Sequence, residues 1–286
     1  MTESKLAGIT KESAFRTFKI TIFWVLMINL VYYLYEDVTA YLFSDPGSTL
    51  FDTLEAFAVS IDYIAWMVLI VLFEMETNAQ SRDSFTGVRK WVIGALTAIC
   101  YVVLVYAAYG YAAALVDTYN LEPIEDRSAC YFANTNFAYM TESARPVELT
   151  EKNCGDLKGE KLFKFPSDNV IATESVLPAL LKLGWVDIFN SNAWLLVVLM
   201  FQIELSLEQA KKLTKRRLKM VMAWKIFAYL LLFVCAVYWT IFSDFIDWWD
   251  AWLWLLAFIL IDLNMLGLDE TQNQQAINRA AAAKAS

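Results

Sequence analysis

The sequence contains no histidine, and its 286 residues include only five prolines and nine glycines. Without imidazole, the chain lacks the usual ligand of haem and copper and the commonest general base at neutral pH. It also lacks a CxxC metal pattern, a phosphate-binding glycine loop and the G-x-S-x-G turn of serine hydrolases. We therefore expect no enzymatic activity, no metal site and no cofactor, although a lipid could bind to a chain of this composition.

Hydrophobic residues make up 58% of the chain. Several apolar runs are about 20 residues long, which is the length that a helix needs to cross the hydrocarbon core of a bilayer. The composition therefore predicts an all-α integral membrane protein with six transmembrane helices. The expected spans lie near residues 19–38, 56–75, 91–115, 192–207, 221–242 and 245–268.

A short pattern occurs three times, each time as an Ala-Trp pair within an apolar run. An acidic residue follows each tryptophan by ten positions. The pairs are Trp66 and Glu76, Trp194 and Glu204, and Trp252 and Asp262. Internal repetition of this kind predicts a protein built from three repeated helical hairpins.

The distribution of Lys and Arg indicates which ends of the spans face the inner side of the membrane. Seven of the 23 basic residues lie in the long segment 117–184, and the other sixteen lie near the opposite ends of the spans or in the terminal segments. Short loops rich in Lys and Arg stay in the cytoplasm, whereas long loops translocate largely regardless of charge. We therefore expect a multi-pass protein of the plasma (inner) membrane, with the N-terminus and the C-terminus both cytoplasmic.

The expected organisation has five parts. These are an amphipathic cytoplasmic N-terminus (1–18), spans 1 to 3 (19–116), an outer periplasmic or extracellular loop (117–184), spans 4 to 6 (185–268) and a polar cytoplasmic tail (269–286). Within this scheme, residues 175–192 are expected to form an amphipathic helix along the outer surface before the fourth span. Since no Gly or Pro occurs from Trp185 to Leu266, the fourth helix is expected to continue past Glu204 to about Met220.

The four cysteines fall into two pairs by position. Cys130 and Cys154 lie in the outer loop, whereas Cys100 and Cys235 lie inside apolar spans. Two cysteines in one extracytoplasmic loop predict a disulfide, which would stabilise that loop by about 3 kcal/mol. The two cysteines within the spans are typical of small buried hydrophobic residues.

A cluster of six basic residues follows the fourth span and marks the inner face. It consists of Lys211, Lys212, Lys215, Arg216, Arg217 and Lys219. The cluster could bind anionic lipid or an acidic partner, or it could be an ordinary charge run that sets the topology. As partners we expect the lipid bilayer and other membrane proteins or further copies of this chain, and no nucleic acid.

The repeated acids have two interpretations. Asp62 and Glu76 are fourteen residues apart, which places them within about 40° of each other around a helix. Three hairpins packed around an axis with such faces inward would form an acidic path for cations. The candidates to line this path are Asp62, Glu76, Glu204 and Asp262. Alternatively, these acids simply lie at the level of the lipid headgroups, where the spans end.

Asp262 differs from the other acids because apolar residues follow it. We therefore expect it below the membrane interface and in need of a partner. Lys225 lies about five residues into the fifth span and could pair with Asp262 or Glu204 inside the membrane. The alternative is that the Lys225 ammonium extends to the inner headgroups.

Two functions fit these patterns. The first is a non-catalytic subunit or scaffold of a larger membrane assembly, in which the outer loop and the basic cluster bind partners. The alternative is a small cation channel or transporter lined by the repeated acids. Spans without Gly or Pro breaks favour the subunit, because transporters usually interrupt helices at their substrate site. The acidic repeat favours ion transport.

The predicted topology can be checked with Thr214→Cys and Asn136→Cys variants labelled by a membrane-impermeant maleimide. We expect the thiol at position 214 to react only from the inner face, because Lys and Arg residues flank it. The thiol at position 136 should react only from the outer face, because it lies in the long loop. Labelling of either position from the opposite face would overturn the topology.

Overall fold

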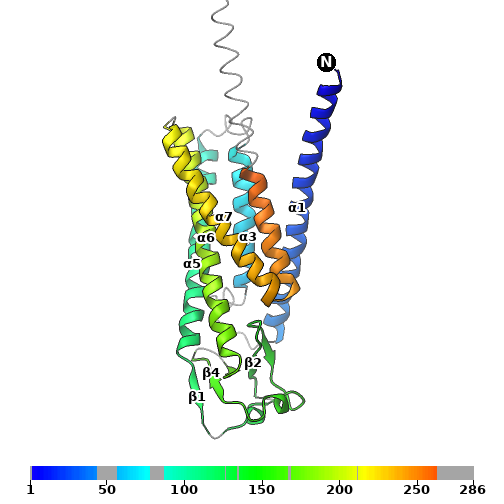
Figure 1. Ribbon diagram of the computed structural model, residues 1–286, viewed down its shortest axis with the longest axis vertical. Helices are drawn as coiled ribbons and strands as arrows, with labels where there is room; N and C mark the ends of the chain where they lie inside the picture. The colour runs from blue at the N-terminus through cyan, green and yellow to red at the C-terminus, as the bar shows by residue number, and fades with distance from the viewer. Residues whose placement is uncertain are drawn as a thin grey trace, which may run out of the picture. The chain divides into compact units, whose positions relative to one another are not determined.

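The computed structural model describes residues 2–43, 57–77, 87–210 and 212–262, apart from positions 126, 134, 167 and 168. Helices make up most of this part of the chain (Figure 1). They are α1 (Thr2–Phe43), α3 (Ala58–Thr77), α5 (Val88–Tyr119), α6 (Leu177–Gln209) and α7 (Lys215–Phe242). Each of these five helices is long and apolar enough, by length and composition, to cross a membrane. The expected class, a helical membrane protein, is supported by this finding.

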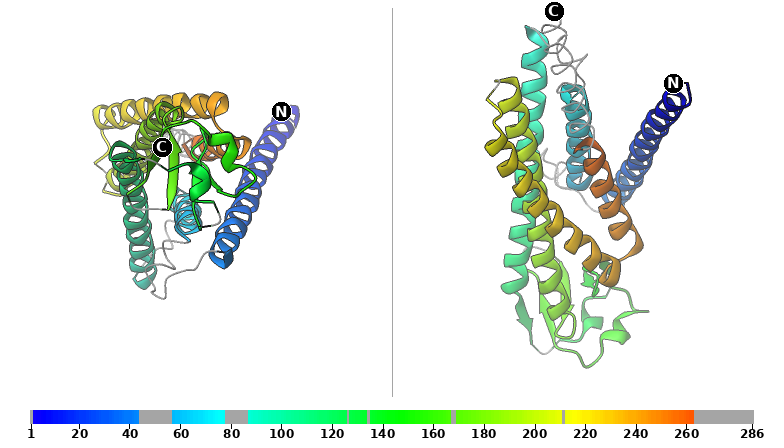
Figure 2. Two further views of the ribbon diagram at one scale, coloured as in Figure 1. Left: turned by 90° about the horizontal axis from the view of Figure 1, so that it is seen from below. Right: turned by 45° about the horizontal axis from the view of Figure 1, so that its top comes forward.

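Residues 245–262 form a further helix, drawn in orange in Figures 1 and 2. Its described part carries three carboxylates, those of Asp247, Asp250 and Asp262. Residues 263–268 of the expected sixth span and the tail 269–286 lie outside the described residues. The sixth span and the threefold repeat therefore stay predictions.

The fourth helix is shorter than the sequence predicts, because α6 ends at Gln209 and α7 begins at Lys215. The expectation of one helix continuing to about Met220 is wrong. Backbone bonds from Ala210 N to Ser206 O and from Lys212 N to Leu207 O close the end of α6. The Thr214 hydroxyl then accepts a hydrogen bond from the backbone N–H of Arg217 and caps the start of α7. These capping bonds end one helix and begin the next without Gly or Pro.

Helices α1 and α6 both continue across boundaries that the sequence suggested. The N-terminal segment 1–18 is continuous with the first span, since α1 runs from Thr2 to Phe43. The amphipathic surface helix expected at 175–192 is part of α6 instead, which begins at Leu177 with Pro178 in its first turn, where a missing N–H costs nothing. With 33 residues, α6 is about 50 Å long, more than the ~30 Å hydrocarbon core requires. Its first turns can therefore extend beyond the bilayer.

The chain divides into two compact units. Unit 1 contains Met1–Leu104, Gln202–Leu213 and Trp249–Ser286, and unit 2 contains Val105–Phe201 and Thr214–Trp248.

In unit 1, α1 and α3 form an antiparallel pair. At one end, the Lys19 ammonium forms an ion pair with the Glu74 carboxylate. At the other end, the Asp37 carboxylate accepts a hydrogen bond of 3.0 Å from the backbone N–H of Ser60. Ser60 lies in the first turn of α3, where N–H groups have no partner within the helix and where the helix dipole favours a negative charge. These two contacts set the register of the pair.

In unit 2, the segment between α5 and α6 folds into a five-stranded sheet of strand order β1-β4-β5-β2-β3. Strands β2 and β5 run parallel, and the other neighbours run antiparallel. The all-α expectation is therefore wrong for this segment. Its strands have only three or four residues, too few to show an alternating pattern in the sequence. The elements are β1 (Glu122–Ile124), η1 (Ala129–Tyr131), β2 (Ala138–Met140), β3 (Pro146–Glu148), η2 (Cys154–Leu157), β4 (Leu162–Lys164) and β5 (Val170–Thr173).

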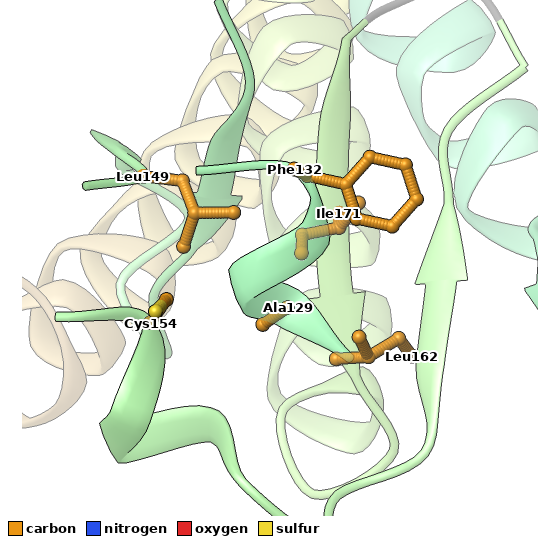
Figure 3. Close-up of a cluster of buried hydrophobic side chains, with 6 residues drawn as sticks. All are labelled: Ala129, Phe132, Leu149, Cys154, Leu162 and Ile171. Carbon is orange, nitrogen blue, oxygen red and sulfur yellow. The ribbon is translucent and has the colours of Figure 1, made fainter. Parts of the chain in front are cut away.

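Two hydrophobic clusters pack on opposite faces of β5. Ile171 belongs to a cluster with side chains from η1, η2 and β4, which Figure 3 shows gathered beside the disulfide cysteine Cys154. The next residue, Ala172, belongs to a second cluster with Phe165 and with Leu180 of α6. Successive residues of a strand point to opposite faces, so β5 joins the disulfide-bonded layer to the start of α6. We call this folded segment, residues 121–176, the outer module, after the outer loop that the sequence predicts there.

The predicted disulfide between Cys130 and Cys154 is confirmed, with Cα atoms 4.9 Å apart. The other two cysteines, Cys100 and Cys235, are buried free thiols, as expected. The disulfide joins η1 to η2 beneath the cluster around Ile171. It therefore links the two short helical turns that cover this face of the sheet.

Replacing both disulfide cysteines, Cys130→Ser with Cys154→Ser, should destabilise the outer module by about 3 kcal/mol. The reason is that the bond joins residues 24 positions apart and so lowers the conformational entropy of the unfolded chain. Pulse proteolysis in urea, with cleavage followed inside residues 121–176, measures this change. The control is Cys100→Ala, which removes a thiol of α5 outside the module and should leave the module's midpoint unchanged. Thiols at positions 130 and 154 that react in the intact protein without reductant would contradict the bond.

Candidate functional site

Three helical segments of unit 1 meet at one carboxylate. Asp250, in the helix at 245–262, accepts hydrogen bonds on Oδ1 from Asn29 Nδ2 of α1 at 2.8 Å and from the Tyr63 hydroxyl of α3 at 2.9 Å. The Asn29 side chain is also hydrogen-bonded to Tyr63. Asn29 and Tyr63 are each 5% exposed. We call these three residues the Asp250 cluster.

Aromatic rings surround the cluster. The Tyr63 ring lies 5.4 Å from the ring of Tyr33 and 5.1 Å from that of Trp254, measured between centroids. Trp254 follows Asp250 by four residues, so both side chains lie on one face of their helix. The Trp66 ring extends this group of aromatic side chains, because its centroid lies 6.0 Å from that of Trp254 and 5.8 Å from that of Phe258. These rings pack around the buried Tyr63 side of the cluster, whereas Asp250 is half-buried.

The arrangement is suited to holding helices together. A carboxylate within apolar helices has to be paired, hydrated or protonated. Asn29 and Tyr63 supply donors from two other helices, so separating any of the three helices would remove a hydrogen bond from a half-buried carboxylate. The chemistry that the geometry provides is interhelical hydrogen bonding.

The predicted acidic residues all belong to unit 1, and their role in a cation path stays a prediction. Asp62 of α3 is half-buried and hydrogen-bonded by the Trp66 side chain, while its Oδ1 atom is buried without a hydrogen-bond partner. Glu204 of α6 is buried, and Asp262 is a half-buried residue at the end of the described chain. The side chain of Glu76 lies outside the described residues. Within the described ranges, no three acidic or cysteine side chains come together as a metal site.

Lys225 of α7 is buried in unit 2, and its Nζ atom lies 3.9 Å from the centroid of the Phe201 ring of α6. This cation–π contact gives the ammonium an attractive neighbour within the apolar helices. The expected pairing of Lys225 with Asp262 or Glu204 stays a prediction.

The basic cluster is exposed wherever it is described. Lys212 lies between α6 and α7, and the other described members lie in the first two turns of α7; Lys211 lies outside the described residues. The described members of α7 are Lys215, Arg216, Arg217 and Lys219. Cations at a helix N-terminus oppose the helix dipole, so these side chains do not serve the stability of α7.

A second polar contact, in unit 2, connects the outer module to the end of α7. Arg145 lies in the turn between β2 and β3 and forms ion pairs with Asp244 at 2.7 Å and Asp247 at 3.2 Å. The Thr141 hydroxyl accepts from Arg145 N and donates to Arg145 O, which holds the turn in place. Ser243, at the C-terminal end of α7, donates to Asp247 at 2.6 Å. The Arg145 contact therefore fixes the module against the turn that follows α7.

Sequence reasoning missed the Asp250 cluster. Asp250 lies near the start of the expected sixth span and had no predicted role, and Tyr63 stands beside Asp62, the residue that the sequence analysis selected. Asn29 gave one usable signal, since it is a strongly polar amide in the middle of the first apolar run. Tyr63 and Asn29 lie 187 and 221 positions before Asp250, and no sequence periodicity relates residues so far apart.

No family model, no curated protein and no solved structure matches this chain.

The Asp250 cluster can be tested with Tyr63→Phe, which removes the hydroxyl and keeps the ring. We expect the free energy of unfolding in mixed detergent micelles to fall by about 1 kcal/mol, the size of interhelical hydrogen bonds in membrane proteins. The matched control is Tyr109→Phe, because Tyr109 is 68% exposed on α5. Combining Tyr63→Phe with Asp250→Ala should cost less than the two changes added together. Equal losses from Tyr63→Phe and Tyr109→Phe, or strict additivity, would contradict the cluster.

Proposed function

We propose that this protein is a non-catalytic subunit or scaffold of a larger membrane assembly. In this proposal, the long apolar helices anchor the chain in the plasma membrane and the outer module provides a folded surface outside it. The partner is another membrane protein that packs against α5.

The observation that carries the proposal is the outward face of α5. Tyr106 and Tyr109 are 60% and 68% exposed, and both lie inside a helix of 32 residues. A phenol hydroxyl that faces hydrocarbon finds no hydrogen-bond partner there, which costs free energy. A neighbouring protein helix with a suitable acceptor removes that cost. The space beside Gly110 is open, and small residues let helices approach closely in lipid.

The described polar contacts within unit 1 also support a structural role. The Asp250 carboxylate is hydrogen-bonded by Asn29 and Tyr63, and Lys19 is paired with Glu74. Groups used in this way hold helices in a fixed register. A transport path, by contrast, needs polar groups that exchange partners with the transported ion.

The finer topology belongs to this proposal. We infer six spans arranged as three hairpins, with both termini and the basic cluster on the cytoplasmic side and the outer module on the opposite side. The antiparallel pair of α1 and α3 supports the first hairpin. The lengths of α5 and α6, 32 and 33 residues, would carry the outer module beyond the hydrocarbon core.

One observation favours the alternative, a small cation channel or transporter. The Oδ1 atom of Asp62 is buried without a hydrogen-bond partner in the described part of the chain. A buried carboxylate oxygen in that condition is a place where a cation or a proton could bind. The residues concerned would be Asp62, Glu76, Glu204 and Asp262, as the sequence predicted.

Photocrosslinking in native membranes separates the two functions. We would place benzoylphenylalanine at Tyr106 and at Tyr109, with Leu230 as the control because it is an aliphatic residue of α7 with 62% exposure. The tyrosine positions should crosslink to a different membrane protein, which mass spectrometry then identifies, and the control position should not. The reason is that a partner helix is expected only against the tyrosine face.

Crosslinks only to a second copy of this chain, or no crosslinks, would contradict the subunit role. Reconstituted vesicles then test the alternative directly. Cation flux that Asp62→Asn abolishes without changing the amount of folded protein would establish ion transport instead.

A further inference from the structure

Unit 1 contains an apolar groove of about 650 Å³ between α1, α3 and the start of α5. This volume lies within the roughly 300–1,000 Å³ typical of ligand sites. All three helices contribute lining residues, among them Phe23 and Leu30 of α1, Ile64 and Met75 of α3, and Arg89 and Leu96 of α5. Ile64 and Leu96 remain 44% and 41% exposed, so the groove is open laterally.

The length of the groove matches one leaflet of a bilayer. Ile64 and Met75 are eleven positions apart on α3, which corresponds to about 16 Å along the helix axis. One half of the hydrocarbon core is about 15 Å thick. The groove can therefore take an acyl chain along its full length.

The charge of the groove is confined to one end. Among the described residues that line it, Arg89 is the only charged one. Arg89 lies in the first turn of α5 and Met75 near the end of α3, so both belong to the end where the chain passes from α3 to α5. The Lys19–Glu74 ion pair lies at this same end. Polar groups gathered at one end of an apolar groove are typical of a site whose ligand has a polar head and an apolar tail.

The head that fits is an anion that contains phosphate. A guanidinium has five N–H donors in a planar fork that matches phosphate oxygens, and it can bind phosphate while it also contacts a protein group. A cation in the first turn of a helix opposes the dipole, so Arg89 is not there to stabilise α5.

We propose that this groove binds one anionic phospholipid, with an acyl chain along α1, α3 and α5 and the headgroup phosphate at Arg89. The site belongs to unit 1 and does not depend on the tyrosine face of α5. Its specificity comes from the three helices that line the groove and from one guanidinium that selects the charge of the head.

The test is native mass spectrometry of the full chain in detergent, with added dioleoyl phosphatidylglycerol or dioleoyl phosphatidylcholine. These two lipids share their acyl chains and differ in head charge. We expect one bound lipid and a preference of about fivefold for the anionic one, the effect of one basic side chain near the surface. Arg89→Gln should reduce that preference to about one, whereas Lys90→Gln, which changes the neighbouring cation outside the groove lining, should keep it.

A second pair of variants tests the acyl-chain part of the site. Val68→Trp fills the groove and should lower the bound fraction of both lipids several-fold, because the indole takes the volume of the chain. Val102→Trp is the control, since Val102 is 70% exposed on α5 and does not line the groove.

Three results would overturn the proposal. These are equal retention of both lipids in the wild-type chain, an unchanged preference in Arg89→Gln, and no lipid retained at all, which would mean that a protein segment or a second copy of the chain occupies the groove. Arg89 is exposed, so its variant should fold, and the conclusion does not depend on Val68→Trp alone.

Discussion

The carboxylate of Asp250 has to be satisfied among apolar helices, and this requirement determines how unit 1 packs. Tyr63 and Trp254 pack together beside this half-buried carboxylate, and the protein supplies hydrogen-bond donors to it. Asn29 and Tyr63 can both reach Oδ1 of Asp250 only at one rotation of each helix about its axis and one shift along that axis. This applies to α1, α3 and the helix at 245–262. Each hydrogen bond contributes only about 1 kcal/mol, but few other arrangements keep both. The cluster therefore contributes more to the choice of arrangement than to its stability.

The same principle operates at the ends of the helices. Asp37 satisfies a free N–H at the start of α3, and Lys19 neutralises Glu74 near its end. In the outer module, the small size of the fold limits how much apolar surface it can bury. Short strands bury little apolar surface, and the disulfide between η1 and η2 adds the constraint that such small folds usually need. Arg145 then connects the module to the turn after α7.

Two exposed features of the described part of α5 differ in their chemistry. The tyrosine face of α5 exposes the side chains of Tyr106 and Tyr109, and the groove at the start of α5 is apolar along its length and cationic at one end. One helix would thus contact a protein partner through its later turns and a lipid through its first turns. A subunit of a larger membrane assembly needs both kinds of contact, since lipids fill the gaps between neighbouring subunits.

The sequence by itself determined the membrane class, the approximate positions of the second, third and fifth spans, and the pairing of Cys130 with Cys154. These follow from the length of apolar runs and from the placement of cysteines, which are properties of single segments. Only the tertiary structure decided that Asp250 bonds to Asn29 and Tyr63 and that β2 pairs in parallel with β5. Helix rotation, helix depth and strand pairing depend on contacts between residues far apart in the chain. Apolar periodicity does not specify them, because every residue of a lipid-facing helix is free to be apolar.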